Sequence, residues 1–181
     1  FIATTGMTIG GSRCGSQTIS AVLAANSATI TGVLTLLVTR DDTTATFTGT
    51  SSSFNALSVQ ADNGVVVQSD VSTVVGALYL DGDADNSSSE DDTNTVSFTA
   101  GRSVSAKTVL TLESTKSSLI RAGALTLKGG SGVVILDSLT SSAASTALVV
   151  NADHESAGDG TLTIQTGKTV TTNNGDTTIT A

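Results

Sequence analysis

The sequence ALSVQADNGVVVQSDVSTVVGALYLD, residues 56–81, decides the fold class. Its short apolar runs begin at Leu57, Val65, Val71 and Leu78, and segments that contain Gly, Asn, Ser or Asp separate them. Short apolar runs between turn-forming residues predict β-strands, and no segment of the chain has a helical period. We therefore expect an all-β protein built from many short strands.

The same pattern recurs along the chain. Apolar residues alternate with Thr in TLTIQ at 161–165 and in KTVTT at 168–172. This period of two is typical of strands that bury one face. Aromatic residues make up only 3% of the chain and Pro is absent. We expect a core of stacked Val, Leu, Ile and Ala layers, with turns formed by Gly and Asx residues.

Longer internal similarity is also present, because residues 56–112 resemble residues 124–180. The corresponding stretches are ALSV at 56–59 and ALTL at 124–127, GVVV at 64–67 and GVVI at 132–135, and TVSFTAG at 95–101 and TLTIQTG at 161–167. The first 55 residues contain a weaker copy. The chain is expected to be one repeat domain, 1–181, made of three unequal modules: 1–55, 56–123 and 124–181.

The spacing of the apolar runs predicts a parallel β-solenoid. Leu57 to Leu78 spans 21 residues and Leu125 to Leu148 spans 23 residues, which is about one coil. The alternative is an antiparallel β-sandwich that a strand from a neighbouring subunit completes. We favour the solenoid because stacking requires similarity between whole multi-strand blocks, which a single sandwich does not need.

The two ends of the sequence favour self-association into a polymer or fibre. Neither end has an evident polar cap, and uncapped solenoid ends expose unpaired strand edges. The stretch TTITA at 177–181 followed by FIA at 1–3 would read like a junction inside the chain. The sequence starts without Met and stops within a predicted strand, so we expect it to belong to a longer protein.

Charge excludes several classes of partner. The net charge is −8 and the pI is about 4.3, and such a surface repels nucleic acid and anionic lipid. No apolar run approaches 18 residues, so we expect no membrane insertion. The single cysteine, Cys14, cannot form an intrachain disulfide. We expect it to be a small buried apolar residue, with an interchain disulfide as the alternative.

One acidic loop is a candidate calcium site. Counted from Asp81, carboxylates fall at positions 1, 3, 5 and 12 of a calcium loop, namely Asp81, Asp83, Asp85 and Asp92. Position 6 is Asn86 where a sharp turn needs Gly, position 12 is Asp where Glu is usual, and no helices flank the loop. The alternative is a solvated acidic loop that binds no metal. No other cofactor is expected.

The same loop carries the sequon Asn86-Ser87-Ser88, so Asn86 is a candidate glycosylation site.

Catalysis is not expected. His154 is the only histidine, and one Tyr with four Phe is too few for an aromatic sugar platform. Thr pairs at 46/48, 161/163, 169/171 and 178/180 suggest, as a minor alternative, an ice-binding array.

The pattern ADNGVVVQSDVSTVVGALYLDGDAD at 61–85, followed by VSFTAGRSVSA at 96–106 and VLTLES at 109–114, resembles the tandem repeats of giant secreted β-solenoid surface proteins of the filamentous-haemagglutinin-like adhesin type. The resemblance implies an extracellular or cell-surface location and an elongated, non-catalytic role, and it assigns no functional residues.

We therefore expect a structural protomer of an extracellular filament or elongated adhesin stalk, which assembles end to end through exposed strand edges. The alternative is a carbohydrate-binding or carbohydrate-processing β-helix domain, with glycans as partners.

Overall fold

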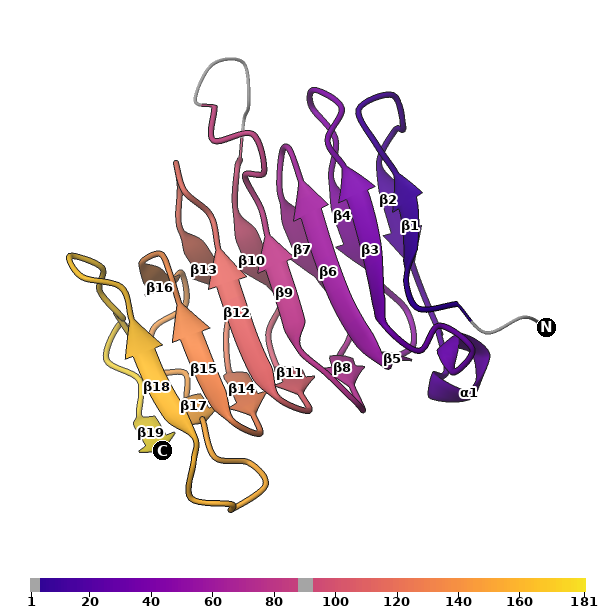
Figure 1. Ribbon diagram of the computed structural model, residues 1–181. Coiled ribbons are helices and arrows are strands. Elements are labelled where there is room, and N and C mark those ends of the chain that lie inside the picture. The colour runs from indigo at the N-terminus through magenta and orange to yellow at the C-terminus, as the bar shows by residue number, and fades with distance from the viewer. Residues whose placement is uncertain (1–3, 88–92) are drawn as a thin grey trace.

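The chain folds into three parallel β-sheets that face a common core (Figure 1). The structure is a computed structural model and describes residues 4–87 and 93–181. Among these residues the only helix is α1, Ala24–Ser27, and no helix has the length and apolar character needed to cross a membrane. The expected all-β class is confirmed.

Sheet I has seven strands: β1 (Met7–Gly10), β3 (Val33–Val38), β6 (Ala56–Ala61), β9 (Leu78–Asp81), β12 (Val109–Glu113), β15 (Gly132–Ile135) and β18 (Thr161–Ile164). Sheet II has six strands: β2 (Gln17–Ile19), β4 (Ala45–Phe47), β7 (Val65–Val67), β10 (Val96–Phe98), β13 (Leu119–Arg121) and β16 (Leu139–Ser141). Sheet III has six strands: β5 (Ser52–Phe54), β8 (Val71–Thr73), β11 (Arg102–Ala106), β14 (Leu125–Gly129), β17 (Leu148–Asn151) and β19 (Thr177–Thr180).

The chain visits the sheets in the order I, II, III and then starts again, so each circuit is one coil of a parallel β-solenoid. In register, Leu57 pairs with Leu78 and Leu78 pairs with Leu110. Coil length therefore varies from 21 to 32 residues, and the longer coil contains the acidic loop. The predicted solenoid is confirmed. All strand pairs in the described ranges are parallel, which rules out the antiparallel sandwich.

Equivalent apolar side chains stack into columns that run along the solenoid. One column of sheet I passes through Leu36, Val59, Leu80, Leu112 and Ile135, and each of these side chains is at most 4% exposed. Full burial of such a side chain contributes about 1.5–3 kcal/mol. The alternation in the sequence thus supplies one buried side chain at every second strand position, and stacking of coils completes the burial.

The similarity between modules does not coincide with this stacking. Leu57 lies in β6 of sheet I, whereas Leu125, its counterpart 68 residues later, lies in β14 of sheet III. In space Leu125 pairs with Leu148, as the coil spacing predicts. Inward apolar residues alternate with outward polar residues in all three sheets, so matching short strands by sequence does not tell which sheet they belong to. The repeat that the strands follow is the coil.

An arginine occupies an inward position that apolar residues hold in earlier coils. Arg121 of β13 follows Phe47, Val67 and Phe98 in a column of sheet II, and it is fully buried. Its guanidinium donates to backbone carbonyl oxygens and to one hydroxyl, namely Gly123 O (2.7 Å), Thr146 Oγ1 (2.9 Å), Thr146 O (3.0 Å), Ala147 O (3.2 Å) and Thr172 O (3.2 Å). Burial lowers the pKa of Arg121. The side chain links its own coil to the following two.

Candidate functional site: the two open ends

The N-terminal end of the solenoid exposes two strand edges. β1 and β2 are the first strands of sheets I and II, and each pairs on one side only within the described residues. Met7 and Ile9 occupy inward positions of β1, but they are 45% and 43% exposed because no coil of the part that the structure describes lies over them. This end therefore exposes backbone groups and apolar side chains. In the middle coils, groups at the equivalent positions are covered by a neighbouring coil.

The third sheet is covered at this end. Helix α1 and the residues before it lie where sheet III would have another strand, next to β5. Ser53 N donates to Val22 O (2.7 Å), and Val22 N donates to the Ser52 hydroxyl (3.2 Å). The buried Ser27 hydroxyl donates to Ser53 O (3.3 Å). This cap was not predictable from the sequence, because so short a helix has no hydrophobic period to detect.

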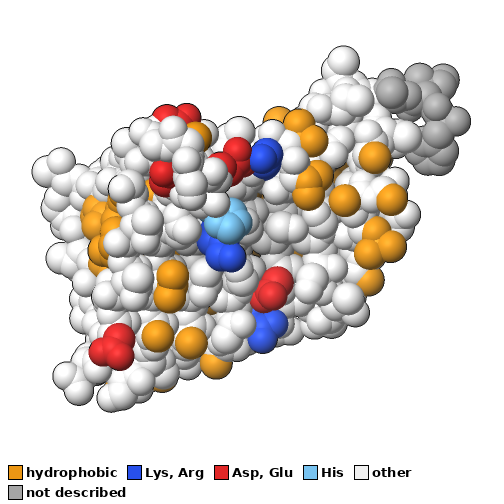
Figure 2. Space-filling model, turned by 90° about the horizontal axis from the view of Figure 1, so that it is seen from below, with side chains coloured by type: hydrophobic (Ala, Val, Ile, Leu, Met, Phe, Trp, Pro, Cys, Tyr) orange, Lys and Arg blue, Asp and Glu red, His pale blue; other side chains and the backbone are white. Residues whose placement is uncertain are grey.

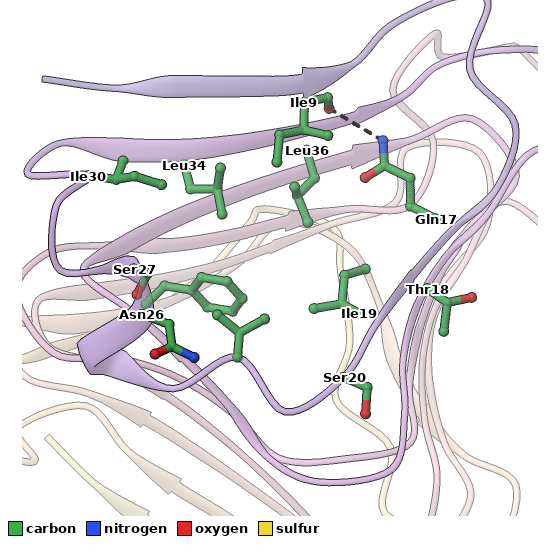
Figure 3. A pocket seen from close by; sticks show the side chains of 12 residues that line it. Ile9, Gln17, Thr18, Ile19, Ser20, Asn26, Ser27, Ile30, Leu34 and Leu36 are labelled. Carbon is green, nitrogen blue, oxygen red and sulfur yellow. Dashed lines mark hydrogen bonds between the residues drawn. The ribbon is translucent and has the colours of Figure 1, made fainter. Parts of the chain in front are cut away.

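A pocket of about 490 Å³ opens between these elements (Figure 3). Its apolar wall includes the inward side chains of the first two coils: Ile9, Ile19, Val22, Leu34, Leu36 and Phe54. On its rim, Gln17 Nε2 donates to Ile9 O and to Leu37 O, each at 3.3 Å, and so links β2 to sheet I. The pocket is the unfilled cross-section of the core at the end of the solenoid.

The C-terminal end exposes the opposite edges, those of β18 and β19 (Figure 1). Ile164 and Ile179 are 39% and 54% exposed, although their partners in the preceding coil, Ile135 and Val150, are buried. In sheet II the place of a strand is taken by Val170, which forms a single bridge with Leu139. The last coil thus has the same inward pattern as the middle coils, but no other coil of the described residues covers it.

The acidic loop does not bring its described carboxylates to one point. Asp81 Oδ1 accepts from Asp83 N (3.0 Å), Asp83 Oδ2 accepts from Lys116 N (2.6 Å), and Asp85 Oδ1 accepts from Ser87 N (2.9 Å). Each carboxylate thus serves a different backbone group, and no group of three metal-ligating side chains forms among residues 4–87 and 93–181. The fourth predicted ligand, Asp92, lies outside the described residues. Calcium at this loop stays a prediction.

Asp81 belongs to a different cluster, which the sequence did not reveal. The Tyr79 hydroxyl lies 3.1 Å from Asp81 Oδ2 and 2.5 Å from Glu113 Oε2, and strand pairing places Glu113 beside Asp81. Burial raises the pKa of Asp81 to about 6, against the lowering effect of the bonds from Asp83 N and Tyr79. Burial and the two carboxylates raise the pKa of Tyr79 above its usual value. Only the register between coils brings these three groups together.

The other predicted sites lie on the surface. Asn86 is exposed, as a glycosylation acceptor must be, in a left-handed turn with φ of 58°. Cys14 is exposed too, which corrects the expectation that it is buried, because it lies in the turn between β1 and β2 and not on an inward strand position.

The only histidine lies at the rim of a small polar groove (Figure 2, pale blue). This groove has a volume of about 320 Å³, and its lining includes Lys107, His154 and Glu155. Lys107 Nζ and Glu155 Oε1 form an ion pair at 2.5 Å. The groove lies at the corner between sheets III and I, away from Tyr79 on the outer face of sheet I.

The Thr pairs do not form one array. Thr46 lies in β4 of sheet II, Thr161 and Thr163 lie in β18 of sheet I, and Thr178 and Thr180 lie in β19 of sheet III. The three sheets face different directions, so these pairs cannot present one flat lattice. The geometry gives no support to the ice-binding alternative.

Comparison of the chain with protein-family models, with curated proteins and with solved structures gives no match.

Proposed function

We propose that this chain is a structural unit of an extracellular filament or elongated adhesin stalk, in which solenoids join end to end. One observation carries the proposal: both ends of the solenoid expose unpaired parallel strand edges together with inward apolar side chains. An exposed strand edge is a template for pairing with another chain unless it is blocked. Among residues 4–87 and 93–181, only the edge of sheet III at the N-terminal end is covered, by helix α1 and the residues before it.

The described side chains favour a structural role over catalysis. Tyr79 is the only tyrosine, its hydroxyl is bonded to the neighbouring carboxylates Asp81 and Glu113, and one half-buried ring is too few for an aromatic sugar platform. His154 lies beside the ion pair of Lys107 with Glu155. We find no nucleophile hydrogen-bonded to a base among residues 4–87 and 93–181. We propose that the protein is not an enzyme and that its surface location follows from its role as a stalk.

Self-association as a function of concentration tests the proposal. Sedimentation velocity and negative-stain images of the purified chain should show rods that lengthen as the concentration rises. Each unit adds roughly 34 Å, since seven coils stack at about 4.8 Å each. Short particles of one length at every concentration would contradict the proposal.

A carbohydrate-binding role is the second candidate, because the groove at His154 combines a basic, an acidic and an imidazole side chain with apolar Val74. Glycan-array binding that is lost in His154→Ala, without any self-association, would favour this candidate over the filament.

A further inference from the structure

The two ends of the solenoid differ in shape although their strands are in the same register. At the N-terminal end the core is hollow, with a pocket of about 490 Å³ beside Ile9. At the C-terminal end the inward side chains of Ile164 and Ile179 stand exposed over a filled core, since Ile135 and Val150 beneath them are buried. One end therefore has a recess, and the other has apolar side chains that would fit a recess.

The columns of sheet I predict how two copies would meet. Ile9 and Ile164 belong to the same column, because Ile9 pairs with Leu36 at its start and Ile164 pairs with Ile135 at its end. If β18 of one copy pairs with β1 of the next in the register of all other coils, Ile164 faces Ile9 and Leu162 faces Met7. In sheet II the same continuation sets Val170 opposite Gln17, since the column through Leu139 begins at Gln17.

Contacts between like ends fit less well. Two N-terminal ends would place one recess against another and leave the core hollow, and a void in a core forfeits packing contacts. Two C-terminal ends would press Ile164 and Ile179 against their own copies with no recess to enter. Only unlike ends bring exposed apolar side chains to an empty apolar pocket.

We infer that the contact between units is heterologous: the C-terminal coil of one copy seats on the N-terminal pocket of the next, with Ile164 and Ile179 directed into it. The inference rests on the proposed filament and specifies its polarity and its contact residues. A heterologous contact that does not close produces an open filament, whereas contact between like ends produces only a dimer. Helix α1 covers the edge of sheet III, so strands continue across the junction only in sheets I and II, and the column of Ile179 begins at Ser52, next to Val22 of the pocket wall.

End-blocked variants test this polarity. Ile9→Glu places a charge in the N-terminal pocket and leaves the C-terminal end intact, and Ile179→Glu does the reverse. Both positions are about half exposed, so the fold should tolerate the change. Val75→Glu is the matched control, because Val75 is 58% exposed in the turn between β8 and β9 and its substitution alters the net charge equally.

We expect Val75→Glu to polymerise like the unmodified chain. Each end-blocked variant alone should remain at 17.9 kDa in sedimentation equilibrium, and an equal mixture of the two should form a dimer of twice that mass and nothing larger. Circular dichroism and thermal unfolding check that each variant is folded. If Ile9→Glu does not fold, Met7→Glu replaces it.

The remaining outcomes separate the inference from the proposed function. If the unmodified chain stays monomeric, the filament proposal fails and the inference with it. If it polymerises and both blocked variants still do so, association uses the side faces, and both the end-to-end filament and its polarity are wrong. Dimers of Ile179→Glu alone would show that two N-terminal ends meet, and dimers of Ile9→Glu alone would show that two C-terminal ends meet.

Discussion

The middle coils and the last coil contain the same kinds of residue in the same register, yet they differ in burial. Ile135 in β15 is fully buried, whereas Ile164, its direct partner in β18, is 39% exposed. The two side chains share residue type, sheet and column. Only the presence or absence of one further coil separates them. A solenoid therefore does not bury its apolar residues coil by coil, because each coil depends on its neighbours.

The largest effect is expected at Arg121, because its side chain donates hydrogen bonds from a middle coil to the last two coils. Arg121→Ala should lower the free energy of unfolding by about 4 kcal/mol, because it leaves a cavity and deprives several buried carbonyl groups of their donor. Urea unfolding measures the loss, and hydrogen exchange should increase first in the last two coils. Arg102→Ala is the control, since Arg102 pairs with Asp70 at the surface and should cost less than 1 kcal/mol. Equal losses in both variants would contradict this account.

The Ile pair tests the comparison directly. Ile135→Ala should cost about 3 kcal/mol because it opens a cavity in a packed column. Ile164→Ala in the monomer should cost about 1 kcal/mol, since its side chain is already partly in water. The two unfolding curves should be recorded at a concentration where sedimentation shows monomers only. If the filament forms as proposed, raising the protein concentration should narrow the difference between the stability losses of Ile135→Ala and Ile164→Ala.

Asp81, on the outer face of a middle coil, predicts that the stability of the fold depends on pH. Burial raises the pKa of Asp81 to about 6 in the folded chain, above its unfolded value of 3.8, so the folded state binds the proton more tightly. Stability should rise by about 2 kcal/mol as the pH falls from 7 to 4. Thermal unfolding in EDTA, which removes any calcium, measures the trend, and Asp81→Asn should abolish it. A stability that falls over this range in the unmodified chain, relative to Asp81→Asn, would show that the sign is wrong.

The smallest effect is expected at the acidic loop, the longest excursion from the middle coils. If this loop binds calcium as the spacing predicts, millimolar calcium should stabilise the chain by about 1 kcal/mol, as for any weak ligand of the folded state. Asp85→Ala should remove the effect without harm to the fold, because the Asp85 carboxylate accepts one local bond, from Ser87 N. An unchanged melting temperature on addition of calcium would count against the site.

The strands of residues 56–81 could be predicted from the sequence because alternation and turn residues are local properties. Leu57 and Leu78 lie one coil apart, as their spacing indicates. The assignment of strands to sheets was not predictable in the same way, because Leu57 and Leu125 have similar neighbours in the sequence but lie in different sheets. Sequence similarity between short strands reports the inward and outward pattern, which all three sheets share.

By itself, the sequence determined the all-β class and the length of the shorter coils, from Leu57 to Leu78 and from Leu125 to Leu148. The tertiary structure decided which groups meet between coils: Tyr79 with Asp81 and Glu113, and Arg121 with the carbonyl groups of the next two coils. It also placed a recess at one end and exposed apolar side chains at the other. These features depend on the register between coils of unequal length, and that register is fixed by packing across the core and not by any local stretch of the chain.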